Sequence, residues 1–432
     1  MPDPAAPSTL SPPQRTAVLR PRDQLAEVGR CHSTGRTIRL CYNTFGAAKN
    51  PCVLLVMGLA SPGLFWDDRL CTLLAHSGPY HVIRFDNRDV GCSTHLDDCK
   101  GGDGVLPVGP TSYLRYANAA LRPGARSIRE VYTLDDMAAD AFGLLDALRI
   151  RFVHLVGSSV GGMIAQCMVL AHPERVLSLT LMSTHSSSPH AQWPGIRDIM
   201  SFISLAPKST SARYASRIAR ATSAEERQRL CAERDAKRVT AYASSFAKVL
   251  ERMSGDQSKY PFDHVAAQRQ MTRIFKRSLC VTGGPRQFLA LLNAPCRDDA
   301  LRQRITSVAP MSQSKAGGDV ENISRHATSA IKTPFYVPTI IIQGDCDPLV
   351  PASNARHLAS VIAGSRLYVV EGMGHTLIPA LRDTYIQLIR DNVRAGEAAA
   401  QSLGRKSQRT TAAAADGGLF AKKQPVKAAS RL

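Results

Sequence analysis

The sequence predicts an α/β protein whose mostly parallel sheet is interrupted by a helical insertion. Short apolar runs rich in β-branched residues, such as FVHLVG at 152–157, alternate with amphipathic helical segments from about residue 24 to residue 184. The alternation stops near residue 185, where helical, Lys/Arg-rich sequence begins, and it resumes at 337–344. Because strands that alternate with helices form parallel sheets, we expect two separate stretches of chain to build one core sheet.

The first stretch is expected to supply most of the strands. Gly35 joins the first two as a hairpin, and a helix over 132–150 begins after Thr133, a favourable N-cap. A second helix follows Ser159, and the Gly/Pro-rich segment 101–126 is interpreted as a surface excursion. The strands are predicted at 24–33, 37–46, 51–58, 81–86, 152–157 and 176–184.

The second stretch adds strands at 337–344 and 365–372 and a final helix over 377–393. Before it, the insertion ends in a low-complexity segment, 306–333, which is expected to be a loop. The predicted organisation is a disordered N-terminus (1–24), the first half of the core (25–184), a helical cap (185–333), the second half of the core (334–395) and a disordered basic tail (396–432).

The composition is that of an ordinary globular protein, with 44% apolar and 21% charged residues. No apolar run is long enough for a membrane span, and the first twenty residues lack the apolar centre of a secretory signal. The eleven cysteines show no CxxC pair and no metal-ligand spacing. We therefore expect a reducing compartment, no structural disulfides, and no metal or cofactor.

The chain is strongly basic, with a formal net charge of +19. The excess of Lys and Arg lies in the tail and around 213–277, and no nucleic-acid-binding motif accompanies it. This distribution favours a solvated basic face over a nucleic-acid partner.

A serine lies at the predicted turn from the strand 152–157 into the following helix. The sequence GSSVG at 157–161 fits the pattern G-x-S-x-G, with Ser159 at its centre. So sharp a turn holds the central residue in a strained backbone conformation with its hydroxyl exposed. The helix N-terminus also offers free N–H groups to a developing oxyanion. We therefore predict that Ser159 is a nucleophile.

A serine nucleophile needs a base, and the base needs an acid that orients it. In a sheet of this kind the expected order is Ser, then Asp or Glu, then His, each just after a strand. Asp345 and Asp347 follow the strand 337–344, and His375 follows the strand 365–372. The sequence therefore predicts a base at His375 and an acid at one of the two aspartates.

An oxyanion hole requires two convergent N–H groups. One belongs to Val160, the residue after the nucleophile. The strand 51–58 ends at Gly58, where a tight turn can point the N–H of Leu59 inward. Leu59 and Val160 are therefore the predicted donors, and loss of one such donor costs ~2.7–4 kcal/mol in other serine enzymes.

These residues resemble the α/β-hydrolase fold superfamily, in particular carboxylesterases of the aclacinomycin methylesterase type. The resemblance implies a mostly parallel, eight-stranded sheet flanked by helices, with the cap inserted after the sixth strand. It also implies that Ser159 is the nucleophile and His375 the base. The family acid precedes Pro in D-P-x-V-P, which selects Asp347 and leaves Asp345 as the reserve candidate. The resembling segments are VMGLASPGLFW, HVIRFDNRDVGCST, HLVGSSVGGMIAQCMVLAHPERVLSLTLMST, PTIIIQGDCDPLVP and SRLYVVEGMGHTLIP.

This chain departs from the family pattern in two places. Family members often have His before the glycine of the oxyanion strand, where this chain has Met57. The cap, which usually sets substrate choice, matches only at 286–302, a segment resembling the one that precedes the acid strand. Leu64, Phe65 and Trp66 are candidates to line an acyl or ester pocket, or else to pack in the core.

The predicted function is hydrolysis of a small-molecule carboxylic ester through an acyl-enzyme intermediate. Two other hydrolase activities stay open: a proline iminopeptidase-like aminopeptidase, which would need acidic cap residues, and an acyl-CoA thioesterase, which would suit a basic cap. A non-catalytic binding protein on a hydrolase scaffold would predict erosion of the Ser, Asp and His residues, all of which are present. Epoxide hydrolase and dehalogenase chemistry would require an acid at position 159.

Ser430, Arg431 and Leu432 resemble the S-K-L peroxisomal address, with Arg in place of Lys. We therefore expect a peroxisomal targeting receptor as a partner and a peroxisome-like microbody of the glycosome type as the compartment, or otherwise the cytoplasm.

Overall fold

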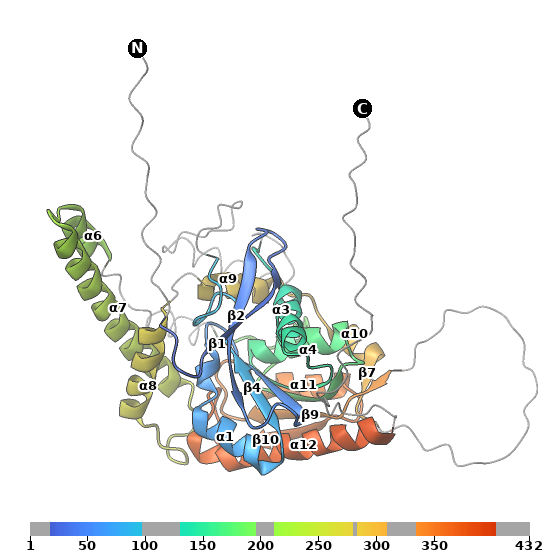
Figure 1. Cartoon of the computed structure of the whole chain (residues 1–432). Helices are drawn as coiled ribbons and strands as arrows, with labels where there is room; N and C mark the ends of the chain where they lie inside the picture. Colours follow the sequence, from blue (N-terminus) through green and yellow to red (C-terminus); the bar gives the residue numbers. More distant parts are fainter. Residues whose placement is uncertain (1–17, 97–129, 196–210, 280–282, 309–333, 403–432) are drawn as a thin grey trace, which may run out of the picture.

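The computed structural model describes residues 18–96, 130–195, 211–279, 283–308 and 334–402 (Figure 1). The predicted excursion at 101–126, most of the 306–333 segment and the C-terminal residues 430–432 lie outside these ranges. Within the described part of the chain, no helix has the length and apolarity needed to cross a membrane.

Among the described residues, eight strands form one sheet in the order β1-β2-β4-β3-β5-β6-β9-β10. β1 pairs with β2 and β2 with β4 in antiparallel fashion, and all other neighbours are parallel. The predicted fold class, including the first hairpin, is confirmed. The strands are β1 (Gln24–Arg30), β2 (Thr37–Phe45), β3 (Cys52–Val56), β4 (His81–Phe85), β5 (Val153–Ser158), β6 (Val176–Met182), β9 (Thr339–Gly344) and β10 (Arg366–Val370).

Helices cover both faces of the sheet, so the central strands are buried at every position. One face carries α3 (Leu134–Ala147), α4 (Val160–Ala171), α10 (Asp298–Arg304) and α11 (Ala352–Val361). The other face carries α1 (Asp68–Ser77) and α12 (Arg382–Ser402), which crosses below the sheet in Figure 1. α3 begins after Thr133 as predicted, with a reciprocal capping box to Asp136.

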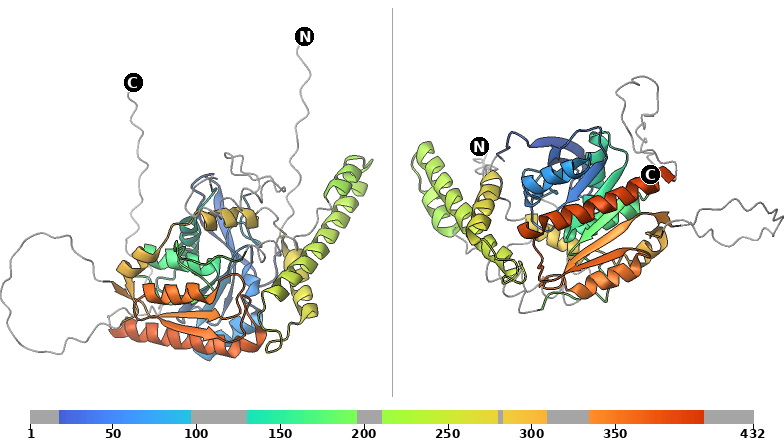
Figure 2. Two further views of the ribbon diagram at one scale, coloured as in Figure 1. Left: turned by 180° about the vertical axis from the view of Figure 1, so that it is seen from behind. Right: turned by 90° about the horizontal axis from the view of Figure 1, so that it is seen from below.

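The insertion after β6 contributes the cap helices α6 (Ser211–Ala219), α7 (Ala224–Arg252), α8 (His264–Arg277) and α9 (Gly283–Leu292). Figure 2 shows α6 and the first half of α7 projecting away from the sheet. The insertion was predicted as helical sequence followed by a loop, but it also contains a short strand: β7 (Ile305–Thr306) pairs with β8 (Phe335–Tyr336), which follows the insertion. Two-residue strands lack enough residues to show a periodicity. Short 3-10 turns lie at η1 (Gly63–Phe65) and η3 (Pro379–Leu381).

Buried ion pairs fasten the cap to the loop after β4. Arg277, at the end of α8, binds Asp23 and Asp86 at 2.7 Å each. Arg286, in α9, binds both oxygens of Asp89 at 2.7 and 2.8 Å. None of these side chains is more than 5% exposed. The loop is therefore one of the junctions between cap and core.

The segments predicted to be disordered at the two ends of the chain, 1–24 and 396–432, include residues that the structure describes as ordered. Residues 18–23 are ordered because Asp23 is held by partners distant in sequence. Residues 396–402 continue α12 because Gly396, Ala399 and Ala400 are buried on the sheet, where a Cβ added to Gly396 would lie 2.6 Å from the Leu177 carbonyl oxygen. The final helix also begins later than predicted, at Arg382, because the 3-10 turn η3 precedes it.

Candidate active site

Ser159 occupies the turn between β5 and α4, as the G-x-S-x-G pattern predicts. Its φ of 56° and ψ of −124° put a non-glycine residue in a strained conformation. The flanking glycines permit close packing, since a Cβ on Gly161 would lie 2.2 Å from the Val56 carbonyl oxygen and one on Gly157 would lie 2.4 Å from that of Gly161. The helix and two strands therefore converge on the serine only with glycine at both positions.

His375 and Asp347 complete a hydrogen-bonded chain with Ser159. The Nε2 atom of His375 lies 3.0 Å from the Ser159 Oγ, and its Nδ1 lies 2.8 Å from the Asp347 Oδ2. The carboxylate accepts a hydrogen bond from Nδ1–H, so Nε2 is the atom free to accept from the serine hydroxyl. The three side chains are thus arranged for general-base activation of Ser159.

Asp347 is held as a carboxylate. Burial raises its pKa, but the adjacent His375, together with hydrogen bonds from His375 and the amides of Val350 and Leu349, outweighs burial and lowers the pKa. The two amides donate to Oδ1 at 2.8 and 2.9 Å, and Oδ2 accepts from the histidine at 2.8 Å and from Gln343 Nε2 at 3.2 Å. The group is therefore fixed in both charge and orientation.

The reserve candidate, Asp345, has a different partner. Its Oδ1 accepts a hydrogen bond from the Gly372 amide at 2.7 Å. It therefore holds the start of the loop that carries His375 and leaves the contact with the imidazole to Asp347.

The loop of His375 is fastened to the end of the cap helix α7. The amide of His375 donates to the Met253 carbonyl at 2.7 Å, and that of Gly374 donates to the Ser254 carbonyl at 3.2 Å. Gly255 (φ 90°) packs so closely that an added Cβ would lie 2.4 Å from the Gly374 nitrogen. The cap therefore helps to position the imidazole.

The predicted oxyanion donors lie beside the serine. A Cβ added to Gly58 would sit 3.0 Å from the Ser159 Cβ, so the end of β3 approaches the nucleophile closely. The amides of Leu59 and Val160 have no hydrogen-bond partner in the described part of the chain, and both residues line the cavity that contains Ser159.

Gln287, in α9, holds the loop that carries Leu59. Its Oε1 accepts from the Ala60 amide and its Nε2 donates to the Arg88 carbonyl, each at 2.8 Å. The side chain is 1% exposed, and Ala60 has a positive φ of 53°. Gln287 therefore joins the oxyanion loop, the loop after β4 and the cap.

Ser159 and His375 open into a large cavity of about 1650 Å³ between core and cap. Ligand sites usually measure about 300–1,000 Å³, so this cavity has room for a bulky molecule. Of the three predicted pocket candidates, Phe65 lines it, whereas Trp66 is fully buried in the core and Leu64 packs against the cap. Most of the lining is apolar, and it includes Met57, Met163, Trp193, Phe246, Phe262, Phe288 and Leu291.

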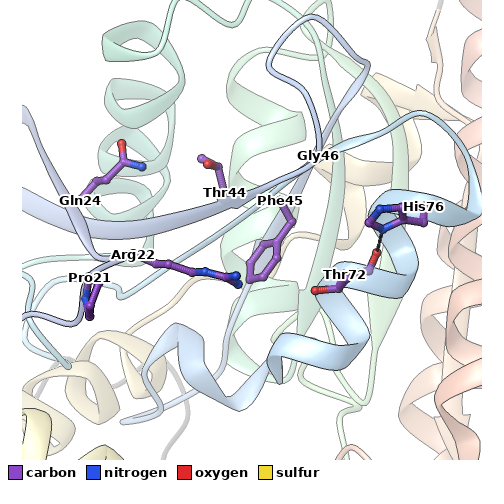
Figure 3. Close-up of a pocket in the computed structure, with 8 residues that line it drawn as sticks. All are labelled: Pro21, Arg22, Gln24, Thr44, Phe45, Gly46, Thr72 and His76. Atoms are coloured by element: carbon purple, nitrogen blue, oxygen red, sulfur yellow. Dashed lines mark hydrogen bonds between the residues drawn. The ribbon is translucent and has the colours of Figure 1, made fainter.

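A second hollow, of about 510 Å³, lies at the edge of the sheet (Figure 3). His76 bonds back to the Thr72 carbonyl of its own helix at 2.6 Å, and Arg22 extends toward Phe45. The described residues that line it include no cysteine, serine or carboxylate. This hollow therefore holds no second serine- or cysteine-based site among the described residues.

One group of possible metal ligands occurs among the described residues, at Asp23, Cys41 and Cys92. The Arg277 guanidinium already donates to Asp23 at 2.7 Å and to the Cys41 sulfur at 3.1 Å. A positive charge thus occupies the position that a metal cation would need.

A sequence model of the alpha/beta hydrolase fold family matches residues 51–379. The match spans most of the chain, and the chain belongs to this family. The predictions of the family and of a hydrolase enzyme are confirmed at this level.

Relatives and solved structures agree with this membership. The chain is 25% identical to rhodomycin D methylesterase DnrP of Streptomyces peucetius over 84% of this chain and 97% of that protein. It is 26% identical to rhodomycin D methylesterase DauP of Streptomyces sp. strain C5 over 79% and 91% of the two chains. A thermophilic esterase from Thermogutta terrifontis superposes with a TM-score of 0.51 at 18% identity, covering 86% of this chain and 99% of that one, which supports the fold.

Sequence reasoning missed the residues that position the site from the cap. Gln287 lies in a segment whose resemblance was recognised without any role for its side chain, and Met253 and Gly255 lie where no family pattern could be carried over. Their contacts join parts of the chain far apart in sequence, so no local signal identifies them.

Proposed function

We propose that this protein is a serine esterase that cleaves a carboxylic ester through an acyl-enzyme intermediate. The observation that carries the proposal is the hydrogen-bonded series Ser159–His375–Asp347, which opens into the cavity beneath the cap. Such a series lets a neutral histidine take the serine proton as the oxygen attacks.

The reaction proceeds in two halves. Ser159 Oγ bonds to the ester carbonyl carbon while His375 Nε2 takes its proton, and Leu59 and Val160 N–H groups stabilise the oxyanion. Collapse breaks the ester C–O bond, and His375 returns the proton to the departing alkoxide. A water molecule then attacks the acyl-enzyme by the same route and releases the acid.

The cavity and the relatives support a bulky, largely apolar ester, with a methyl ester as the first class to examine. An aminopeptidase is less well supported because a substrate amine needs free carboxylates. Two carboxylates line the cavity among the described residues: Asp67 pairs with Arg382 at 3.3 Å, and Asp263 accepts from the Ala266 amide at 2.8 Å.

A fluorophosphonate probe tests the proposal on the purified full chain. Wild type should be labelled covalently, and the Ser159→Ala variant should not be labelled, because the probe reacts only with an activated serine. The neighbouring Ser158→Ala variant is the control and should keep the label. Labelling that persists in Ser159→Ala, or labelling absent from folded wild type, would overturn the assignment.

A further inference from the structure

Three residues at the carboxyl end of β6, Ser183, Thr184 and His185, line the cavity beside the nucleophile. Ser159 donates its amide to the Met182 carbonyl at 2.9 Å, so the two strand ends are directly connected. Thr184 Oγ1 is occupied by a hydrogen bond to the Ser159 carbonyl at 2.7 Å. Among the imidazoles that the described residues contribute to this mostly apolar cavity, His185 is the one outside the predicted triad.

The ring of His185 is held in one tautomer. Its Nδ1 accepts a hydrogen bond from the Ser187 amide at 3.1 Å, within a turn where Ser187 has a φ of 58°. A nitrogen that accepts carries no proton, so the ring proton lies on Nε2. Nε2 makes no hydrogen bond to any residue in the described ranges. His185 thus has a free donor at the cavity wall.

The surroundings fix the orientation of this donor. The His185 ring packs edge-on against Trp193, with the centroids 5.5 Å apart. The segment that carries Trp193 is tied by two hydrogen bonds between Asn354 and the backbone of Gln192, each 2.7 Å long. Rigid donors of this kind select ligands because little entropy is lost when they bind.

A buried positive charge lies directly behind His185. Arg297 is 4% exposed, and its guanidinium donates to the His185 carbonyl at 3.4 Å and to Gln166 Oε1 at 3.1 Å. None of its hydrogen-bond partners in the described chain is a carboxylate. Burial and this charge lower the pKa of His185 to about 4, so the imidazole is neutral at neutral pH. This side of the cavity therefore favours electron-rich groups over cations.

We propose that His185 is a specificity-determining residue whose Nε2–H binds an acceptor oxygen, such as a ketone or enolate oxygen, in the body of a bulky apolar ester. The inference rests on the proposed esterase function and names the class of substrate. The scissile carbonyl is served by Leu59 and Val160, so His185 is available to a second oxygen of the same molecule. His185 therefore discriminates against esters that lack this oxygen. With such an ester bound, its N–H stays unpaired in an apolar wall, which costs binding free energy.

The probes are the methyl esters of 9-oxofluorene carboxylic acid and fluorene carboxylic acid, compared as matched positional isomers that differ by one ketone oxygen. Equilibrium binding is measured by fluorescence titration in the Ser159→Ala background, which does not require turnover. For at least one isomer the ketone ester should bind about tenfold more tightly than the matching fluorene ester. In wild type the kcat/KM ratio should show the same preference.

His185→Phe keeps the ring and its contact with Trp193 but removes the N–H, so the ratio of dissociation constants should fall to near one. His185→Gln retains a donor and should recover part of the preference. His190→Phe is the matched control: His190 is exposed, does not line the cavity and should keep the full ratio. Melting curves establish that each variant is folded.

A preference absent for every isomer, or a preference that survives in His185→Phe, would overturn the inference. Fluorophosphonate labelling of wild type separates the two proposals. If wild type is labelled but shows no ketone preference, the esterase proposal stands and the proposed role of His185 is wrong. If wild type is not labelled but still binds the ketone more tightly, the His185 subsite stands and the esterase proposal is wrong.

Discussion

Asp345 and Asp347 lie two positions apart, yet their carboxylates have different partners. Asp347 Oδ2 lies 2.8 Å from His375 Nδ1, whereas Asp345 Oδ1 binds the Gly372 amide. The sequence favoured Asp347 only through its resemblance to the D-P-x-V-P pattern. At the residue scale the candidates could be named from the sequence, because each proposed catalytic side chain follows a strand end that local pattern identifies. Their catalytic roles stay predictions.

The two aspartates give a paired test of the proposed mechanism. Asp347→Asn should lower kcat by about 10³–10⁴, because the amide oxygen stays with the Leu349 and Val350 amides and the NH2 group then faces His375 Nδ1 as a donor, which favours the wrong tautomer. Asp345→Asn should lower kcat by less than about tenfold, since an amide oxygen can still accept from Gly372. Steady-state kinetics on the same ester compare them. Equal losses in both variants would contradict the assignment of Asp347 as the acid.

At the scale of elements, the strands and the helices α3 and α4 could be predicted because caps and apolar periodicity are local properties. For the cap, the sequence predicted helices but not how they pack, since their packing partners lie far along the chain. Arg277 and its partner Asp23 are 254 positions apart. The fastening of the His375 loop to α7 and the contact of α9 with the oxyanion loop escaped prediction for the same reason.

The contact of α9 with the oxyanion loop makes Gln287 a positioning residue. Gln287→Leu should lower kcat by about ten- to hundredfold, because the Leu59 N–H loses its fixed place. The KM should change less, by about threefold at most, since Gln287 does not line the cavity. The substitution also leaves the Ala60 amide and the Arg88 carbonyl without a partner, which lowers the stability of the fold. Kinetics are therefore measured well below the melting temperature of the variant.

Gln287→Glu keeps an acceptor for the Ala60 amide and should recover part of kcat. Gln268→Leu is the matched control, since the Gln268 side chain makes no hydrogen bond within the described chain. A purely structural role for Gln287 would instead lower the melting temperature and the active fraction while leaving kcat per active site unchanged, as counted by fluorophosphonate titration.

At the scale of the whole molecule, cap and core act as one unit because buried charges cross the boundary between them. Arg277 connects α8 to Asp23 and to Asp86, and Asp86 also accepts from the amides of Gly63 and Cys92. This arrangement sets the cap above Ser159 and fixes the loop after β4. The basic net charge did not reveal it, since the arginines that matter are the buried ones.

Removing the Arg277 charge should therefore weaken the whole fold. Arg277→Met leaves the buried Asp86 without a cation and leaves Asp23 only its longer pair with Arg20, at 3.5 Å, so it should lower the free energy of unfolding by about 3–5 kcal/mol. Arg302→Met, which breaks an exposed pair with Asp299, should cost less than about 1 kcal/mol. Urea titrations followed by circular dichroism at neutral pH measure both values.

The pH dependence of stability tests the ion pair between Arg277 and Asp23. Burial raises the pKa of Asp23, but hydrogen bonds from Arg277 and Asn43 outweigh burial and lower the pKa. A carboxyl group with a lowered pKa stabilises the fold fully above its unfolded value of about 3.9 and loses that contribution as the pH falls through the folded value. The stability difference between wild type and Arg277→Met should therefore be complete at neutral pH and shrink below about pH 4. A difference that stays constant down to pH 3 would show that Arg277 acts through packing, because protonation of Asp23 would then have no effect on it.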